Sequence, residues 1–124
     1  MDDTIFVAAE ACGEARNEAE LAWHEHPAFP GVFLKHLITG ADTGGALSAH
    51  LVRVEPGAAI GEHTHETQFE LHEVLEGGGE CLARGRSMGY APGVRAALPR
   101  AEAHAVRAGS GGLLLRATFA PALV

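Results

Sequence analysis

The chain has 124 residues, a length at which one domain can bury a core of its own. Apolar residues make up 47% and charged residues 20%, which excludes an intrinsically disordered chain. The net charge of −7 argues against nucleic acid or an anionic membrane as a partner, because either would require a basic face. The sequence has no run of about 20 apolar residues, so no membrane-spanning helix is expected.

The N-terminal residues and the cysteines indicate a cytoplasmic protein. The first six residues, MDDTIF, are acidic and lack the basic and apolar segments of a secretory signal. Cys12 and Cys81 are too few for a disulfide framework, and we expect both to be small buried thiols, as in a reducing compartment.

Residues 1–30 are expected to form an extension ahead of the main domain. Residues 4–7 favour a short strand. Residues 8–22 are rich in Ala and Glu and favour a helix, although Gly13 weakens it by about 1 kcal/mol relative to Ala. Two prolines that follow would end any helix. His24 and His26, next to the first of them, are interpreted as a solvated loop.

Residues 31–124 have the pattern of an all-β domain. Apolar and β-branched residues fill 32–39, and residues 46–55 alternate with a period of two. Turn-forming residues at 40–45, 77–79 and 109–112 predict connections between strands, the last of them a hairpin. Further short strands are expected at 58–60, 63–65, 69–75, 80–83, 94–98, 103–108 and 113–119. Many short strands with frequent turns predict a sandwich or a closed barrel.

A histidine pair and a glutamate stand out within this β pattern. His63 and His65 are two apart, so on a strand both side chains would point to one face, about 6.5–7 Å apart at the backbone. Glu70 follows five residues later, which leaves room for a bend that returns the carboxylate to the same point. Taken alone, the pair is equally consistent with a polar loop. A mixed histidine and carboxylate set suits Fe, Mn, Ni, Zn or Co.

The spacing around these residues resembles the first motif of the cupin superfamily at every position. The motif begins at Gly57, continues through His63, His65 and Glu70 and ends at Gly77. The second cupin motif is matched by Gly93, Pro99 and His104, whereas Ala101 stands where the motif has glycine and Ala108 where it has asparagine. The resemblance covers residues from about 46 to 119.

This resemblance implies a jelly-roll-like barrel of antiparallel strands, of the small single-domain RmlC-like kind, with one divalent transition metal ion inside near one mouth. It carries the ligand role to His63, His65, Glu70 and His104. Ala101 puts His104 most in question, because the turn before it must either keep φ negative or accept strain. Three neutral imidazoles and one carboxylate would leave the ion with a net positive charge for an anionic substrate.

Strand parity places two more histidines inside the barrel. If Glu70 faces the interior, so does His72, and if Arg53 faces solvent, His50 faces inward. Each is a candidate for acid–base chemistry near neutral pH, with a core histidine held by hydrogen bonds as the alternative.

These features lead to three hypotheses on function. The first is a metal-dependent enzyme acting on a small carbonyl or carboxylate compound, of the dioxygenase or the lyase and isomerase type. The second is a non-catalytic module that binds a small molecule or a metal, and the third a barrel with a vestigial motif. The resemblance also implies a homodimer, in which residues 4–7 and 31–39 and the out-facing Leu51 and Leu71 would supply contacts.

Overall fold

The computed structural model describes residues 3–8 and 14–124. β-Strands predominate throughout this part of the chain, which confirms the all-β prediction. No helix within these residues is long and apolar enough to cross a membrane.

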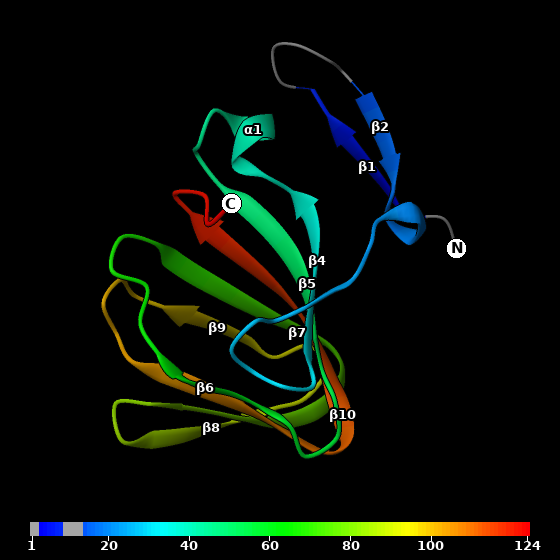
Figure 1. Cartoon of the computed structure of the whole chain (residues 1–124). Coiled ribbons are helices and arrows are strands. Elements are labelled where there is room, and N and C mark those ends of the chain that lie inside the picture. The colour runs from blue at the N-terminus through cyan, green and yellow to red at the C-terminus, as the bar shows by residue number, and fades with distance from the viewer. Residues whose placement is uncertain (1–2, 9–13) are drawn as a thin grey trace.

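The elements follow one another with short connections (Figure 1). Along the described chain they are β1 (Thr4–Val7), β2 (Glu14–Asn17), the 3₁₀ turn η1 (Glu18–Glu20), β3 (His24–Glu25), β4 (Val32–Ile38), α1 (Gly40–Thr43), β5 (Ser48–Val54), β6 (Ala59–His63), β7 (Phe69–Ala83), β8 (Arg86–Tyr90), β9 (Arg95–Leu98) and β10 (His104–Ala120).

Two long strands, β7 and β10, join the two sheets of the barrel. They run antiparallel beside each other over most of their length, as Figure 1 shows. The first part of β7 pairs with β9, and the second part of β10 pairs with β5, which continues to β4 and β3. The other halves of the same two strands pair with β8 and β6. Because each long strand belongs to both sheets, the barrel closes around one interior, as a jelly roll does.

The bend of these strands lies where the sequence analysis predicted turns. Residues 77–79 and 109–112 are not connections between strands but lie inside β7 and β10, where the register shifts between Ala108 and Leu113. A Cβ on Gly77 would lie 2.1 Å from the Gly112 carbonyl oxygen, and one on Gly79 would lie 2.0 Å from that of Arg107. The glycines therefore let two backbones approach closely at the corner of the barrel instead of reversing the chain.

The N-terminal extension forms a small two-stranded sheet beside the barrel (Figure 1). The strand over residues 4–7 is confirmed, but the helix over 8–22 is wrong in the described residues, where 14–17 is a strand and only 18–20 is helical, as a 3₁₀ turn. Residues 9–13 of that helix prediction lie outside the described residues. Antiparallel pairing with β1 outweighs the helix propensity of this segment.

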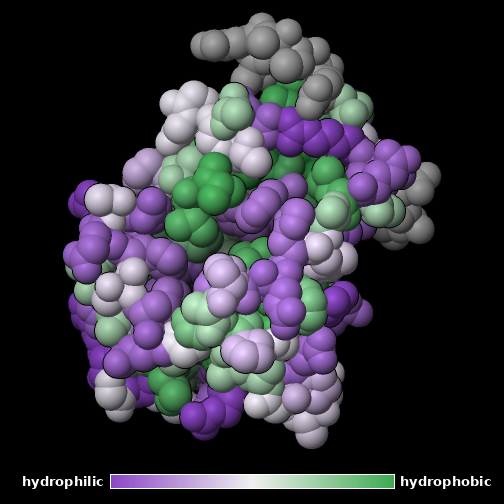
Figure 2. All heavy atoms as spheres, viewed as in Figure 1, coloured by the Kyte–Doolittle hydropathy of each residue, from purple (hydrophilic) through white to green (hydrophobic). Residues whose placement is uncertain are grey.

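The extension is tied to the outer face of the barrel by polar contacts. Arg16 forms an ion pair with Asp42 of α1 and donates a hydrogen bond to the Leu37 carbonyl. Lys35 donates to the Glu18 carbonyl, 3.0 Å away. On this face Leu51 is buried within the single chain, which corrects the expectation that it would be open to a second subunit. Figure 2 shows polar and apolar residues interspersed, with the more apolar ones gathered in the upper half of that view.

The apolar core fills the barrel interior and reaches the predicted metal ligands at Phe119, which contacts His65. Its completely buried members are aliphatic side chains and one thiol: Val54, Cys81, Val106 and Leu115. Cys81 is a free thiol, as expected. Cys12 lies outside the described residues.

Candidate metal centre

His63 and His104 are brought together by direct strand pairing. His63 is the last residue of β6, His104 is the first of β10, and the two are partners in the sheet register. Their ring centroids are 4.4 Å apart. His104 is buried, whereas His63 is half-buried beneath Phe29, whose ring packs on Gly61 where a Cβ would lie only 2.9 Å from it.

Each of these two rings is oriented by a hydrogen bond to a backbone carbonyl. The Nδ1–H of His63 donates to the Gly61 carbonyl at 2.7 Å, and the Nδ1–H of His104 donates to the Glu102 carbonyl at 3.0 Å. In each case the acceptor lies two residues earlier in the chain. A neutral imidazole that donates from Nδ1 carries its lone pair on Nε2. Both rings therefore present Nε2 to the interior, as a metal ligand requires.

Glu70 and His65 complete the cluster. The chain leaves β6 after His63, passes His65 in a loop and returns with Glu70 near the start of β7, so the predicted bend is present. The Glu70 Oε1 atom lies 3.6 Å from Nε2 of His65 and 3.0 Å from Nε2 of His104. One ligand atom from each of the four residues lies within 4.8 Å of all the others. Ligand atoms about 2.1 Å from one ion are roughly 3–4 Å apart, so small side-chain adjustments suffice.

Two atoms of the cluster have no hydrogen-bond partner. Glu70 Oε1 and His104 Nε2 are both buried and both unpaired, because the ring is not aligned for a hydrogen bond at their 3.0 Å separation. A buried acceptor without a partner costs roughly 1–3 kcal/mol. Two such lone pairs facing each other fit a shared cation. The residues present therefore suit a divalent metal ion.

The electrostatics of the site follow from its burial and its mixed charges. Burial raises the pKa of Glu70, but His104 and His72 lower it more, so the carboxyl stays ionised well below its usual range. Burial lowers the pKa values of His63 and His65. Burial also lowers the pKa of His104, but the neighbouring Glu70 carboxylate outweighs it and leaves that pKa raised. Of the three clustered histidines, His104 therefore binds a proton most tightly when no ion is present.

The turn that carries His104 accepts backbone strain. Ala101, in place of the motif's glycine, has φ of 61°, in the left-handed region. Its N–H donates to the His65 carbonyl at 2.8 Å, so the turn before one predicted ligand is bonded to another. Of the alternatives that the sequence left open, accepted strain is the one found, and His104 keeps its place in the cluster. That the four residues bind a metal stays a prediction.

The two other candidate histidines face inward, as strand parity predicted, but neither has a free ring nitrogen. His72 contacts Glu70 Oε2 at 2.6 Å through Nε2 and the Tyr90 hydroxyl at 2.8 Å through Nδ1. His50 contacts His36 Nδ1 at 2.8 Å through Nδ1 and the Ser48 hydroxyl at 2.9 Å through Nε2. Both side chains are buried.

Sequence reasoning missed the partners of these histidines. Tyr90 ends β8 and is buried against His72. Phe119 packs edge-on against both His65 and His50 and so lies between the cluster and the β5 histidine. The period-two pattern of β10 places the Phe119 side chain inside the barrel. Phe119 is paired with Glu70 in the sheet register, so it lies at the level of the cluster.

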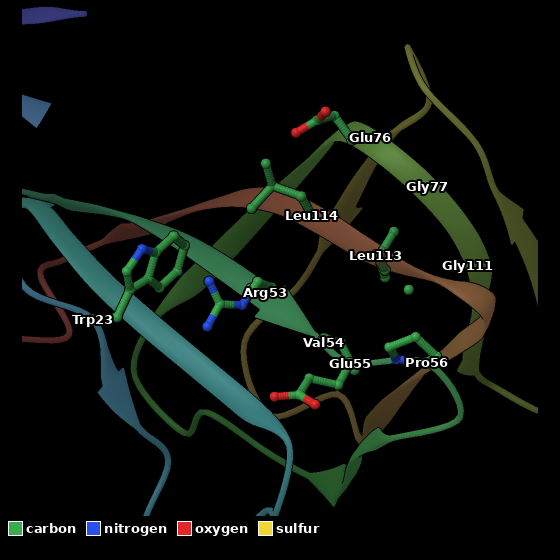
Figure 3. A pocket seen from close by; sticks show the side chains of 11 residues that line it. Trp23, Arg53, Val54, Glu55, Pro56, Glu76, Gly77, Gly111, Leu113 and Leu114 are labelled. Carbon is green, nitrogen blue, oxygen red and sulfur yellow. The ribbon is translucent and has the colours of Figure 1, made fainter. Parts of the chain in front are cut away.

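A surface pocket lies apart from this cluster (Figure 3). Trp23, Arg53, Glu55 and Glu76 line it, with Pro56, Leu114 and neighbouring backbone, and none of the four clustered residues takes part. The Arg53 guanidinium stacks on Trp23, 4.7 Å from the ring centroid, so its charge is already engaged.

Comparison with known proteins identifies the fold. No family model and no curated protein matches the sequence. Among solved structures, KdgF from a Halomonas species is 24% identical, covering 83% of this chain and 88% of its own, with a TM-score of 0.73. A predicted oxalate decarboxylase from Thermotoga maritima is 23% identical over 84% of this chain and 96% of its own, with a TM-score of 0.76.

A third structure carries the family name directly. An RmlC-like cupin from Shewanella frigidimarina is 21% identical, covering 85% of this chain and 87% of its own, with a TM-score of 0.72. At these identities the likeness shows the fold. The two motifs, the bent strands β7 and β10, and the clustered side chains agree with it. The chain is therefore an RmlC-like cupin in fold.

Proposed function

We propose that the protein is an enzyme with one divalent transition metal ion, held by His63, His65, Glu70 and His104, and that it acts on a small carbonyl or carboxylate compound. The observation that carries this proposal is the pair of buried, unpartnered atoms Glu70 Oε1 and His104 Nε2. A cation between them would satisfy both.

The donor set supports a small oxygen-rich substrate. Three neutral imidazoles and one carboxylate leave a divalent ion with one net positive charge, which favours an anionic or strongly polar oxygen ligand. When bound, such an ion polarises a carbonyl or carboxyl oxygen as a Lewis acid. Among the histidines that face Glu70, His65 is the most exposed, with 20% of its side chain accessible. A substrate would therefore enter on the side of His65.

The chain's own residues would shape the site around the substrate. Phe119 packs beside His65 and Phe29 beside His63, so apolar rings flank the cluster. His72 and His50 already use both ring nitrogens, so either would have to give up a hydrogen bond to accept a proton from a substrate. This favours dioxygenase or lyase chemistry that draws on the ion more than on a protein base.

The same engagement of both histidines favours a second candidate function. A non-catalytic cupin that binds a small molecule or a metal needs no proton-transfer group. The two functions differ in a simple way: an enzyme turns over a bound oxygen-rich compound, whereas a binding module returns it unchanged.

A two-stage experiment tests the proposal. The purified protein is loaded anaerobically at about pH 8 with Fe(II), Mn(II), Co(II), Ni(II) or Zn(II), and its metal content is measured by elemental analysis. We expect stoichiometric uptake. Each loaded form is then assayed with dicarboxylates, 2-oxo acids and β-diketones, with product analysis and oxygen uptake as readouts. Turnover supports the enzyme, tight binding without turnover supports the binding module, and no metal uptake overturns the metal-dependent enzyme.

A further inference from the structure

One oxygen of Glu70 is already committed before any metal arrives. Oε2 lies 2.6 Å from Nε2 of His72, and both side chains are buried. Only Oε1 faces the imidazoles of His65 and His104. The two oxygens of one carboxylate therefore have different surroundings, although a free carboxylate can bind a metal through one oxygen or both.

The neighbours of His72 determine which atom donates and which accepts in this hydrogen bond. An ionised carboxylate only accepts hydrogen bonds, so His72 donates to Oε2 from Nε2–H. With Nε2–H as the donor to Glu70, the Nδ1 atom of His72 faces the Tyr90 hydroxyl, 2.8 Å away, as the acceptor. Tyr90 and Cys81 are both buried, and burial raises the pKa values of both groups, so they stay protonated.

The strand register brings these side chains together. Glu70 and His72 are two apart on β7 and face the same side. Tyr90 ends the neighbouring strand β8, and Cys81 lies further along β7 itself, completely buried in the core. Three of these residues thus come from one strand and the fourth from its hydrogen-bonded neighbour.

We propose that His72 and Tyr90 are positioning residues that hold Glu70 as a metal ligand through one oxygen only. The inference rests on the proposed metal site and extends it. With Oε2 retained by His72, the carboxylate occupies a single coordination position, and an octahedral ion with four protein ligands keeps two positions for substrate. If Oε2 were released, the carboxylate could close one of them.

The test uses Co(II) as the probe, because its visible spectrum reports the number and geometry of its ligands. His72→Leu removes the donor to Oε2 and puts an apolar side chain of similar bulk in its place. His72→Gln restores an N–H donor. Tyr90→Phe leaves His72 in place but removes its partner at Nδ1. Val74→Ala, on the same face of β7 and buried, is the control for loosened packing without a lost polar contact.

We expect His72→Leu to weaken Co(II) binding about 10- to 100-fold and to alter the Co(II) spectrum. His72→Gln should recover most of the affinity and the parent spectrum, and Tyr90→Phe should fall between. Val74→Ala should lower the melting temperature but leave affinity and spectrum unchanged. A His72→Leu protein with the parent's affinity and spectrum, or a Val74→Ala protein with the same changes as His72→Leu, would overturn the inference.

The outcome is separable from that of the proposed function. If the parent protein binds Co(II) but no metal form turns over any substrate, the enzyme proposal fails and the variants still decide the role of His72. If turnover is found and His72→Leu equals the parent in Co(II) binding, only the positioning role fails. If the parent takes up no metal, both are overturned.

Discussion

Two sets of histidines inside the same barrel differ in what their second ring nitrogen contacts. His63 and His104 donate from Nδ1 to a backbone carbonyl and leave Nε2 open. His50 and His72 have a side-chain partner on each nitrogen. The first set therefore has a ring nitrogen open to a cation, while in the second set both ring nitrogens are already engaged.

The difference follows from position along the strands. His63 ends β6 and His104 begins β10, so a backbone carbonyl two residues earlier is free to accept from each ring. His50 and His72 lie within β5 and β7, where the backbone groups are used in the sheet and the rings must find side chains. The local backbone thus accounts for which of these histidines keep one ring nitrogen open.

The largest expected effect comes from removing an open histidine. His104→Ala should weaken metal binding by at least about 100-fold, because it deletes the nitrogen that faces Glu70 Oε1. His50→Gln should retain stoichiometric metal, since the contacts of His50 are with His36, Ser48 and Phe119. Elemental analysis and calorimetric titration measure both. Equal metal loss in the two variants would show that the comparison drawn above is wrong.

His50, whose two ring nitrogens are both engaged, should instead affect how the free energy of unfolding depends on pH. Burial, then His36, lowers the pKa of His50 to about 4, with Glu70 acting in the opposite direction. The unfolded chain takes up this proton below about pH 6.5 and the folded chain does not, so stability falls as the pH drops. The metal-free protein should lose about 2 kcal/mol through His50 alone between pH 7.5 and 5.

Urea unfolding at the two pH values measures that loss. His50→Gln should show a shallower decline, although His63 and His65 contribute in the same direction. The substitution His26→Gln, at a half-buried histidine in the loop before β4, serves as the control and should follow the parent. An unchanged slope in His50→Gln would mean that His50 is not the group that titrates.

Metal affinity should also depend on pH, because His104 must lose a proton from its open ring nitrogen before it can bind an ion. The pKa of His104 is raised, so in the metal-free protein its proton is the one that an incoming ion displaces. Below that pKa, affinity should fall by up to about tenfold per pH unit, or about 1.4 kcal/mol. Titrations with Zn(II) between pH 6 and 8 test this. An affinity that stays constant over this range would contradict the proposed ligand role of His104.

The smallest expected effect concerns the turn that carries His104. Ala101 has a positive φ, which costs a residue with a Cβ about 1–2 kcal/mol. Ala101→Gly should raise the free energy of unfolding by about 1 kcal/mol, since glycine's greater freedom in the unfolded chain offsets part of the gain. Thermal unfolding measures it, with Ala97→Gly in β9 as a control expected to destabilise. A destabilised Ala101→Gly protein would show that the turn is not strained.

The motif spacing predicted the cluster because spacing fixes which residues a strand and a bend can bring together. His63, His65, Glu70 and His104 meet as expected, and the period-two pattern correctly turned His50 and His72 inward. The glycine-rich segments 77–79 and 109–112 were misinterpreted, since glycine serves equally in a chain reversal and in a close crossing of two strands. Only the partner strand distinguishes these cases.

The sequence by itself determined the all-β class, the cupin spacing and the residues that converge, because alternation and motif intervals are local properties of the chain. The tertiary structure decided which imidazole nitrogens stay open and that the Tyr90 hydroxyl is the partner of His72. Those choices depend on contacts between distant strands. Hydrogen-bond partners are fixed by register across the sheet, which no interval along the chain reveals.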